Sequence, residues 1–391
     1  MANVRKVVPY ITGDGVGPEI MAATKHAIDA VLQKVSGGAV IIDWRELPAG
    51  EASFKRGGEW LPIPTLESIR THGVALKGPL TTPVGGGIRS LNVAIRQKLD
   101  LYASVRPVRY FKGVPSPVRE PEKMNIVIFR ENTEDVYKGL EWTRGSKEAE
   151  GLRMYLNEAL GADLGDDVGI GIKPISERAS KRLVRAALRY AIRKNLEVVT
   201  LVHKGNIMKF TEGAFKEWGY EVAKDEFNDS VVFENDLKGS EMIGMQKKRL
   251  LVNDRIADNM FQQILTRPQE YSVLATPNLN GDYLADACAA QVGGLGLAPG
   301  ANIGEDAAVF EAVHGTAAKY AGKNVANPCS LMLSGAMMLE HLGMASAAEA
   351  LVVGISTALS EGVMTQDLAR LSSEKRYFGT KEFADEVIRR I

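Results

Sequence analysis

The sequence predicts an α/β fold in two domains. The chain has 391 residues, which is more than one hydrophobic core usually supports. Hydrophobic residues make up 45% of it and charged residues 25%, which is the composition of a globular protein. Short apolar runs bounded by turn residues alternate with longer segments of helical period, and this alternation is typical of β-α-β units.

The clearest predicted strands are short apolar runs bounded by turn or charged residues. They are residues 4–11, 73–78, 125–130, 197–205 and 271–278. A further short strand is expected to end at Arg106, because Pro107 follows it. The glycine-rich stretch from Gly293 to Gly304 is expected to be an ordered loop.

Two helices are predicted with particular clarity. The first runs from Pro18 to Val35, with proline in an early turn and Gly37-Gly38 closing it. The second follows Ser176, a suitable N-cap, and stops at Asn195. Its apolar stripe, which should face the core, comprises Leu183, Val184, Ala187, Leu188, Ala191 and Ile192.

Charge and cysteine content exclude several classes of protein. Lys plus Arg and Asp plus Glu are 48 each, so no global field attracts nucleic acid or an anionic membrane. Cys288 and Cys329 are too few for a disulfide framework. Because the N-terminus has no pattern of a secretion signal and no run has the apolar length of a membrane helix, the prediction is a cytoplasmic protein.

Basic residues follow three of the predicted strands. Lys77, Arg130 and the His203-Lys204 pair stand where ligands bind in open α/β sheets, beyond the carboxyl ends of strands. For any one of them, a polar strand end without function is the simpler reading. Together they predict a site for an anion.

The segment that follows the triple glycine Gly85 to Gly87 strengthens this prediction. It has helical period from Ser90 through Asn92 to Arg96, so its N-terminus is suited to bind an anion. Arg96, Arg106 and Arg130 would suit a ligand with several carboxylates, because each guanidinium binds a carboxylate bidentately.

The glycine cluster from Gly13 to Gly17 is not the dinucleotide fingerprint. Its spacing is G-x-G-x-G, and Pro18 occupies the place of the third glycine. The cluster is therefore interpreted as a structural turn near the site.

Three aspartates are candidates for a metal site. Asp282 and Asp286 share one face of a predicted helix, and Asp258 lies in another helical segment. Together they would offer Mg²⁺ or Mn²⁺ the oxygen ligands that these ions prefer. The alternative for each is a solvated helix face. The five histidines are scattered without ligand spacing, which argues against zinc.

Six motifs, in one order along the chain, resemble the isocitrate dehydrogenase branch of the isocitrate/isopropylmalate dehydrogenase family. They are FRENTEDVYKGLEW, LVHKGNIMKFTEGAF, IADNMFQQIL, NLNGDYLADACAAQVGG, FEAVHGTAAKYAGK and the segment at 77–109. The resemblance implies a family-specific, non-Rossmann dinucleotide-binding fold with two α/β domains and a dimer clasp. The large domain would comprise 1–101 and 292–391, the small domain 102–134 and 178–291, and the clasp 135–177, which includes the acidic stretch from Gly145 to Gly171.

The resemblance also implies the activity and the residues that carry it. The expected reaction is the metal-dependent oxidative decarboxylation of isocitrate to 2-oxoglutarate and CO₂ with NADP⁺, a step of the tricarboxylic acid cycle, in a homodimer with shared sites. Ser90, Asn92, Arg96, Arg106 and Arg130 would bind the substrate, and Asn206 would assist. Asp282 and Asp286, with Asp258 of the partner subunit, would bind Mg²⁺ or Mn²⁺. Tyr137 and Lys204 of the partner subunit would carry protons.

The cofactor is expected to be NADP, because Lys319 stands where family members that use NAD place an acidic residue. Gln366 and Ala326 depart from the NADP pattern. The residues implied in cofactor binding are Thr81, Thr82, Glu311, His314, Gly315, Lys319, Tyr320, Asn327, Asp367 and Arg370.

Several alternatives stay open from the sequence. Isopropylmalate, homoisocitrate and tartrate enzymes share the metal and the base, although Ser90 and Asn92 suit a polar third carboxylate better than an isopropyl group. A catalytically silent regulatory subunit would keep the same fold. Ser90 matches a serine that a regulatory kinase phosphorylates in related bacterial enzymes.

Overall fold

The protein is built around one large mixed sheet. The computed structural model describes residues 4–82, 90–237, 249–372 and 376–391. Eleven strands form the sheet in the order β2-β1-β3-β13-β12-β4-β5-β11-β8-β10-β9. In that order the strands are Val40–Glu46, Val4–Ile11, Val74–Lys77, Ala308–Ala312, Pro299–Ile303, Ala103–Arg109, Asn125–Glu131, Val273–Thr276, Val198–His203, Leu250–Ile256 and Val231–Phe233.

Strand direction divides this sheet at its centre. Strand β12 is antiparallel to both β13 and β4, and β4 is antiparallel to β5. All other neighbours are parallel. Two parallel parts therefore meet at an antiparallel centre, which confirms the predicted α/β class. The boundaries of the two domains stay a prediction.

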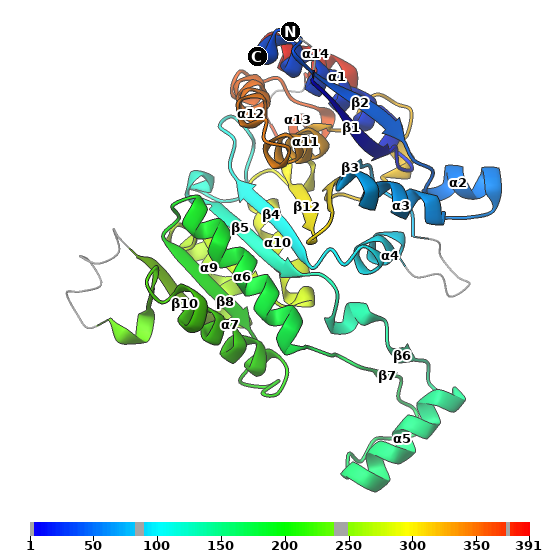
Figure 1. Cartoon of the computed structure of the whole chain (residues 1–391), viewed down its shortest axis with the longest axis vertical. Helices are drawn as coiled ribbons and strands as arrows, with labels where there is room; N and C mark the ends of the chain where they lie inside the picture. Colours follow the sequence, from blue (N-terminus) through cyan, green and yellow to red (C-terminus); the bar gives the residue numbers. More distant parts are fainter. Residues whose placement is uncertain (1–3, 83–89, 238–248, 373–375) are drawn as a thin grey trace.

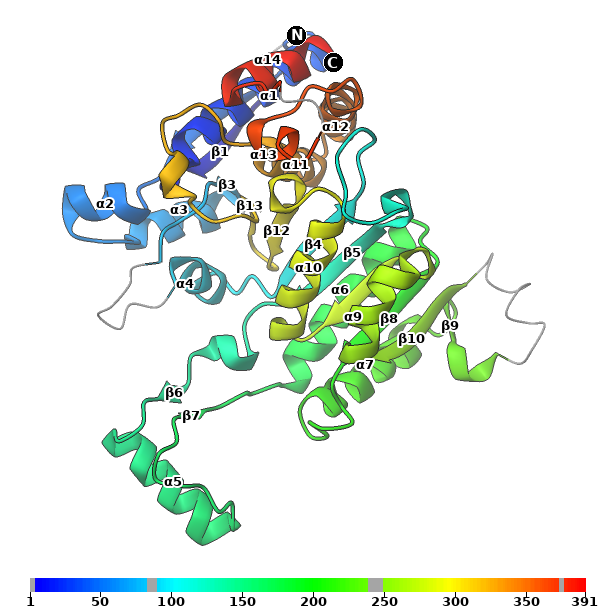
Figure 2. The same cartoon turned by 180° about the vertical axis from the view of Figure 1, so that it is seen from behind.

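Helices cover both faces of the sheet. In the half that contains β5 and β8, α6 and α7 lie on one face and α9 and α10 on the other, as the front and rear views show (Figures 1 and 2). The α-helices in the described residues are α1 Gly17–Ser36, α2 Gly50–Gly57, α3 Ile63–His72, α4 Leu91–Lys98, α5 Lys147–Leu160, α6 Glu177–Arg193, α7 Glu212–Phe227, α9 Ala257–Thr266, α10 Asn278–Gln291, α11 Cys329–His341, α12 Ala345–Ser360, α13 Gln366–Ala369 and α14 Thr380–Arg389.

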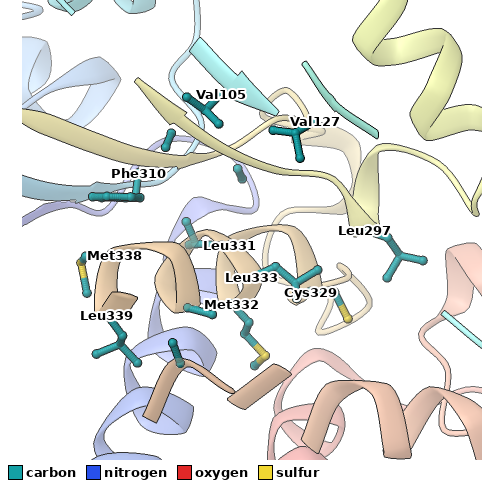
Figure 3. Close-up of a cluster of buried hydrophobic side chains, with 14 of the residues drawn as sticks. Val105, Val127, Leu297, Phe310, Cys329, Leu331, Met332, Leu333, Met338 and Leu339 are labelled. Carbon is teal, nitrogen blue, oxygen red and sulfur yellow. The ribbon is translucent and has the colours of Figure 1, made fainter. Parts of the chain in front are cut away.

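The core of the other half is organised around α11. Figure 3 shows Leu331, Met332 and Leu333 of this helix, with Leu331 on the side nearest to Phe310 of the sheet and Met332 on the opposite side. Each of the four is at most 5% exposed. Burial of each such side chain contributes about 1.5 to 3 kcal/mol to the free energy of unfolding. Because α11 packs against the sheet as well as against α1 and α12, it holds these two helices to the sheet. Both termini lie at this end of the molecule (Figure 1).

An arm projects from the other end of the molecule (Figure 1). It consists of strands β6 (Glu141–Trp142) and β7 (Ile170–Gly171), which pair antiparallel, and α5. Ala149 is the one buried residue of α5, whereas Met154, Tyr155 and Leu160 are more than half exposed. The sequence did not predict this helix because, without a packed face in its own chain, it has no clear apolar period.

Most of the predicted elements are confirmed. The five predicted strands correspond to β1, β3, β5, β8 and β11, and the two predicted helices to α1 and α6. Gly37 ends α1 in the left-handed conformation, and Ser176 caps α6 by accepting a hydrogen bond from the Ala179 N–H. No helix of the described ranges has the length and apolar character to cross a membrane.

Three local predictions were wrong. Strand β4 does not end at Arg106 but runs through Pro107 to Arg109. Proline has no backbone N–H to donate, and none is required on the side of β12, because β12 pairs only with Ala103 to Val105. The predicted glycine-rich loop contains β12. Ile192 is 40% exposed, whereas Ala191 in the same last turn of α6 is fully buried, so the packed stripe includes Ala191 but not Ile192. The glycines at 85–87 lie outside the described residues.

Candidate active site

Three arginines from different elements lie close together. Arg96 comes from α4, Arg106 from β4 and Arg130 from β5, and they are 9%, 6% and 2% exposed. Burial, followed by the charge of Arg96, lowers the pKa of Arg106 to about 10 and also lowers the pKa of Arg130. Grouped buried cations are unfavourable unless anions accompany them, so this arginine cluster is suited to a ligand with several negative charges.

Glu311 and Lys77 hold one side of the arginine cluster. Glu311 lies 2.7 Å from the Lys77 ammonium and 2.8 Å from Nη2 of Arg96, and it accepts a 2.6 Å hydrogen bond from Asn302. These cations keep the pKa of Glu311 well below its usual range, although burial opposes them. Glu311 is 3% exposed and orients Arg96 in this structure. Its predicted contact with the cofactor stays a prediction.

Arg130 connects the arginine cluster to α10. Its Nε donates to Oδ1 of Asn278 at 2.8 Å, and its Nη1 pairs with Asp282. Gly281 makes this approach possible, since a Cβ there would lie 2.7 Å from Arg130 Cβ. Within the described part of the chain, Nη2 of Arg130 and Nε of Arg96 are buried without a hydrogen-bond partner. They are donors still available to an anion.

Asp282 and Asp286 lie on α10 beside the arginines, as their spacing predicted. Partial desolvation and then the charge of Asp282 raise the pKa of Asp286. Two carboxylates that repel in this way fit a hard cation, which would remove the repulsion. The donor set is therefore suitable for Mg²⁺ or Mn²⁺.

Tyr137 joins the same group from η2, a 3₁₀ turn at Asp135–Lys138. Its hydroxyl donates a 2.5 Å hydrogen bond to Oδ2 of Asp282, and the Arg130 guanidinium lies 4.8 Å from its ring centre. Desolvation, together with this hydrogen bond, raises the pKa of Tyr137 to about 12. The phenol therefore stays protonated at neutral pH and has a proton to give.

Lys204 and Asp258 form a second group, beyond the ends of β8 and β10. The Lys204 ammonium lies 2.5 and 2.6 Å from the two carboxylate oxygens of Asp258, and this hydrogen bond lowers the pKa of Asp258. Among the residues that the structure describes, no three acidic, histidine or cysteine side chains of one chain form a metal site. The chain thus brings Asp282 and Asp286 together without Asp258.

The remaining substrate residues border these two groups. Ser90 precedes α4 and is partly buried, and Oδ1 of the neighbouring Asn92 has no partner among the described residues. Asn206 is exposed beside a cavity of about 590 Å³ that His203, Trp218 and Asp254 also line.

The predicted cofactor residues come from several separate segments. Asp14, in the glycine cluster, accepts hydrogen bonds from the backbone N–H of Glu51 and of Thr81, which ties that turn to the Thr81-Thr82 loop. Thr82 itself is exposed. The interpretation of the glycine cluster as a structural turn agrees with this geometry.

The turn after β13 carries the next group. His314 Nε2 is buried without a partner among the described residues, and burial lowers the pKa of this imidazole. Gly315 and Lys319 are exposed, and the Lys319 ammonium lies 4.8 Å from the Tyr320 ring centre. An unsatisfied imidazole and an exposed ammonium fit a polar, negatively charged cofactor.

The last group lies before α11 and at α13. Asn327 donates a 3.1 Å hydrogen bond to Asp367, while Arg370 is exposed at the end of α13. Arg370 and Lys319 come from different segments, and their common role stays a prediction.

Sequence reasoning left several contributors to the site unassigned. Asn278, which holds Arg130, was not assigned to the site, although its position just after a strand was an available signal. Lys77 was predicted as part of the anion site, but its ion pair with Glu311 was not. Asp135 and Glu212, buried carboxylates beside Tyr137 and Lys204, had no such signal.

The fold and the site define an α/β protein whose buried arginines face paired aspartates and a protonated tyrosine, the side chains of an enzyme that acts on an anionic substrate. The chain belongs to the isocitrate/isopropylmalate dehydrogenase family, whose model matches residues 7–387. This confirms the resemblance seen in the sequence.

Curated relatives and a solved structure agree with this family. Isocitrate dehydrogenase [NADP] of Archaeoglobus fulgidus is 55% identical over 98% of this chain and 92% of that protein. The protein of the same name from Coxiella burnetii is 52% identical over 99% of this chain and 92% of its own length. The crystal structure of isocitrate dehydrogenase from Methylococcus capsulatus has a TM-score of 0.81 at 38% identity, covering 98% of this chain and 99% of that one.

Proposed function

We propose that this protein catalyses the metal-dependent oxidative decarboxylation of isocitrate to 2-oxoglutarate and CO₂ with reduction of NADP⁺, as a step of the tricarboxylic acid cycle. The observation that carries the proposal is the arginine cluster facing the Asp282–Asp286 pair, because a tricarboxylate substrate needs both cations and a metal beside it. The names of the curated relatives support the same substrate and cofactor.

In this reaction the arginine cluster binds the carboxylates. Nε of Arg96 and Nη2 of Arg130, which lack protein partners among the described residues, are the donors available for them. Ser90 and Asn92 border the third carboxylate and favour a polar group over an isopropyl group. Glu311 limits the loss of side-chain entropy on binding by fixing Arg96 beforehand.

The metal would bind to Asp282 and Asp286, with Asp258 of the partner subunit as the third ligand. Mg²⁺ or Mn²⁺ there would supply positive charge that favours loss of the substrate's hydroxyl proton. A homodimer with shared sites accounts for the separation of Asp258 and Lys204 from Asp282 within one chain.

Two residues move protons. Lys204 of the partner subunit takes the proton of the C2 hydroxyl while the hydrogen on C2 leaves as hydride. NADP⁺, held by residues that include His314 and Lys319, would supply the hydride acceptor. After the C3 carboxyl group leaves as CO₂, Tyr137 gives its phenolic proton to C3, a role that its position against Asp282 supports.

The test is an assay of NADP⁺ and NAD⁺ reduction with isocitrate, isopropylmalate and homoisocitrate, each with and without Mg²⁺. We expect turnover with isocitrate, NADP⁺ and Mg²⁺ together. Turnover of isopropylmalate or homoisocitrate in preference to isocitrate would refute the substrate. An absence of turnover with any of them would favour a silent regulatory subunit.

Ser90 is proposed as a regulatory position, at which a kinase would add negative charge beside the arginine cluster. Phosphate at the substrate carboxylate's position would repel the substrate. Ser90→Glu should therefore be nearly inactive and Ser90→Ala partly active. Equal activities of the two variants would refute regulation by charge at this residue.

A further inference from the structure

A single lysine joins two buried carboxylates behind the site. Lys173 lies between β7 and α6, on the segment that returns from the arm (Figure 1). Its ammonium is 2.5 Å from Oδ1 of Asp135 and 3.0 Å from Oε1 of Glu212. The two carboxylate side chains are 1% and 0% exposed. Because buried carboxylates are unfavourable without a paired cation, both depend on Lys173. We call these three residues the Lys173 bridge.

The Glu212 end of the bridge fixes the main chain at Lys204. Oε2 of Glu212 accepts a hydrogen bond from the backbone N–H of Lys204. The same oxygen accepts a 2.8 Å hydrogen bond from the side chain of Asn280, in the first turn of α10. Glu212 therefore sets the position of Lys204 relative to the helix that carries Asp282 and Asp286.

The Asp135 end of the bridge fixes the turn that carries Tyr137. Asp135 has φ +66°, a left-handed conformation that costs a non-glycine residue about 1 to 2 kcal/mol. Its side chain accepts hydrogen bonds from the N–H of Val136 at 2.7 Å and of Leu279 at 2.9 Å. Since Pro277 gives α10 no side-chain cap, Asp135 supplies the acceptor for that helix terminus.

We propose that the Lys173 bridge positions both proton carriers of a chain, Tyr137 and Lys204, against the first turn of α10. The inference rests on the proposed function, in which a chain keeps Tyr137 for its own site and lends Lys204 to its partner's site. The bridge of one chain then affects the geometry of two active sites of the dimer. Its cation, Lys173, comes from the segment that returns from the arm.

The members of the bridge are positioning residues. Among the described residues, no hydrogen bond or ion pair joins a member of the bridge to the arginine cluster, so substrate binding should be less affected than proton transfer. Small displacements of a proton carrier slow the reaction strongly, since about 1 Å of misplacement can lower the rate by roughly 100-fold. Loss of the bridge should therefore lower kcat much more than it raises KM.

The first experiment compares Lys173→Met, Lys173→Arg and Glu212→Gln in the full-length enzyme. We expect Lys173→Met and Glu212→Gln to lower kcat at least about tenfold while KM for isocitrate changes by less than about twofold. Lys173→Arg keeps the charge and should recover most of kcat. Should Glu212→Gln fail to fold, Lys173→Met, whose side chain is 18% exposed, carries the test.

The matched control is Glu226→Gln. Glu226 belongs to the same helix as Glu212 but pairs with Arg185 at 2.6 Å and touches neither proton carrier. Its kcat should equal that of the unmodified enzyme. A kcat for Lys173→Met equal to that of this control, or no recovery with Lys173→Arg, would overturn the positioning role.

The second experiment tests the coupling of the two sites. A heterodimer of a Lys204→Met chain and a Tyr137→Phe chain would contain one complete site. We expect added Lys173→Met to lower its kcat when placed in either chain, since one chain supplies the tyrosine and the other the lysine. If only one placement lowers kcat, the coupling is refuted. An inactive parent heterodimer would instead refute the shared sites, and the homodimer comparison would still decide the positioning role.

Discussion

Tyr137 donates a 2.5 Å hydrogen bond to Asp282, so the proposed acid and a proposed metal ligand are in direct contact. The acid thereby lies against α10 and beside Arg130, which pairs with the same carboxylate. One aspartate thus orders the side chain that gives a proton and the side chain that binds a carboxylate.

The Tyr137→Phe variant should lose its proton donor but keep its substrate site. We expect kcat to fall by roughly 100-fold, with KM nearly unchanged, because the arginine cluster is intact. Hydride transfer precedes protonation at C3, so a first turnover of NADPH should still be seen by stopped-flow absorbance.

Tyr190→Phe is the control for this variant. Tyr190, on α6, packs against Phe129 of β5 with 5.3 Å between the ring centres, and it takes no part in the site. Near-normal steady-state turnover of Tyr137→Phe would show that another group protonates C3.

Removal of divalent cations should abolish activity. Excess EDTA should leave no measurable turnover, and Mg²⁺ or Mn²⁺ should restore it. In Asp282→Asn we expect the Mg²⁺ concentration for half activation to rise at least tenfold, because a neutral amide is a poor ligand for a hard cation. Asp385→Asn, on the distant α14, should behave as the unmodified enzyme. Full activity in the chelator would contradict the metal site.

Glu311 should stabilise the fold in a pH-dependent way. Its pKa is lowered in the folded protein, so its contribution to the free energy of unfolding is complete above the unfolded-state pKa of about 4.3. That contribution is lost as the pH falls toward the folded-state pKa. At pH 7, Glu311→Gln should lower the free energy of unfolding by about 3 kcal/mol, because it leaves Lys77 and Arg96 buried without their anion.

The difference between Glu311→Gln and the unmodified protein should shrink when unfolding is measured below about pH 4. Glu340→Gln, which breaks an exposed pair with Lys194, should cost less than about 1 kcal/mol at either pH. A Glu311→Gln effect that does not depend on pH would mean that the carboxylate is not charged in the native state.

Cofactor preference should depend on Lys319. The exposed ammonium would attract the 2′-phosphate of NADP⁺, and a charge-assisted hydrogen bond of about 1.5 to 3 kcal/mol corresponds to roughly 10- to 150-fold in kcat/KM. Lys319→Asp should reduce or reverse the preference for NADP⁺ over NAD⁺. Lys323→Asp, four residues along the same exposed loop, should change it little. An unmodified enzyme that prefers NAD⁺ would refute this assignment.

The parts of the site that follow from local pattern could be predicted from the sequence. Arg130 was found because it ends a strand, and Asp282 with Asp286 because a spacing of four places both on one helix face. The glycine cluster was interpreted as a structural turn, and the hydrogen bonds of Asp14 to Glu51 and Thr81 agree with that interpretation.

The parts that depend on contacts between distant segments could not. Lys173 lies in an irregular stretch, and nothing near it in the sequence shows that Asp135 and Glu212 need its charge. Helix α5 lacks an apolar stripe because its own chain does not cover it. Pro107 indicated a strand end, and only the neighbouring β12 shows why the strand continues.

The central claim is that each active site takes Tyr137 from one chain and Lys204 from the other, and subunit complementation tests it most directly. Lys204→Met and Tyr137→Phe homodimers, each nearly inactive, are unfolded, mixed in equal amounts and refolded. In a two-fold symmetric dimer, half of the molecules would be heterodimers with one complete site, so activity should return to about a quarter of the unmodified level. Mixtures that stay as inactive as the parent homodimers would contradict shared sites.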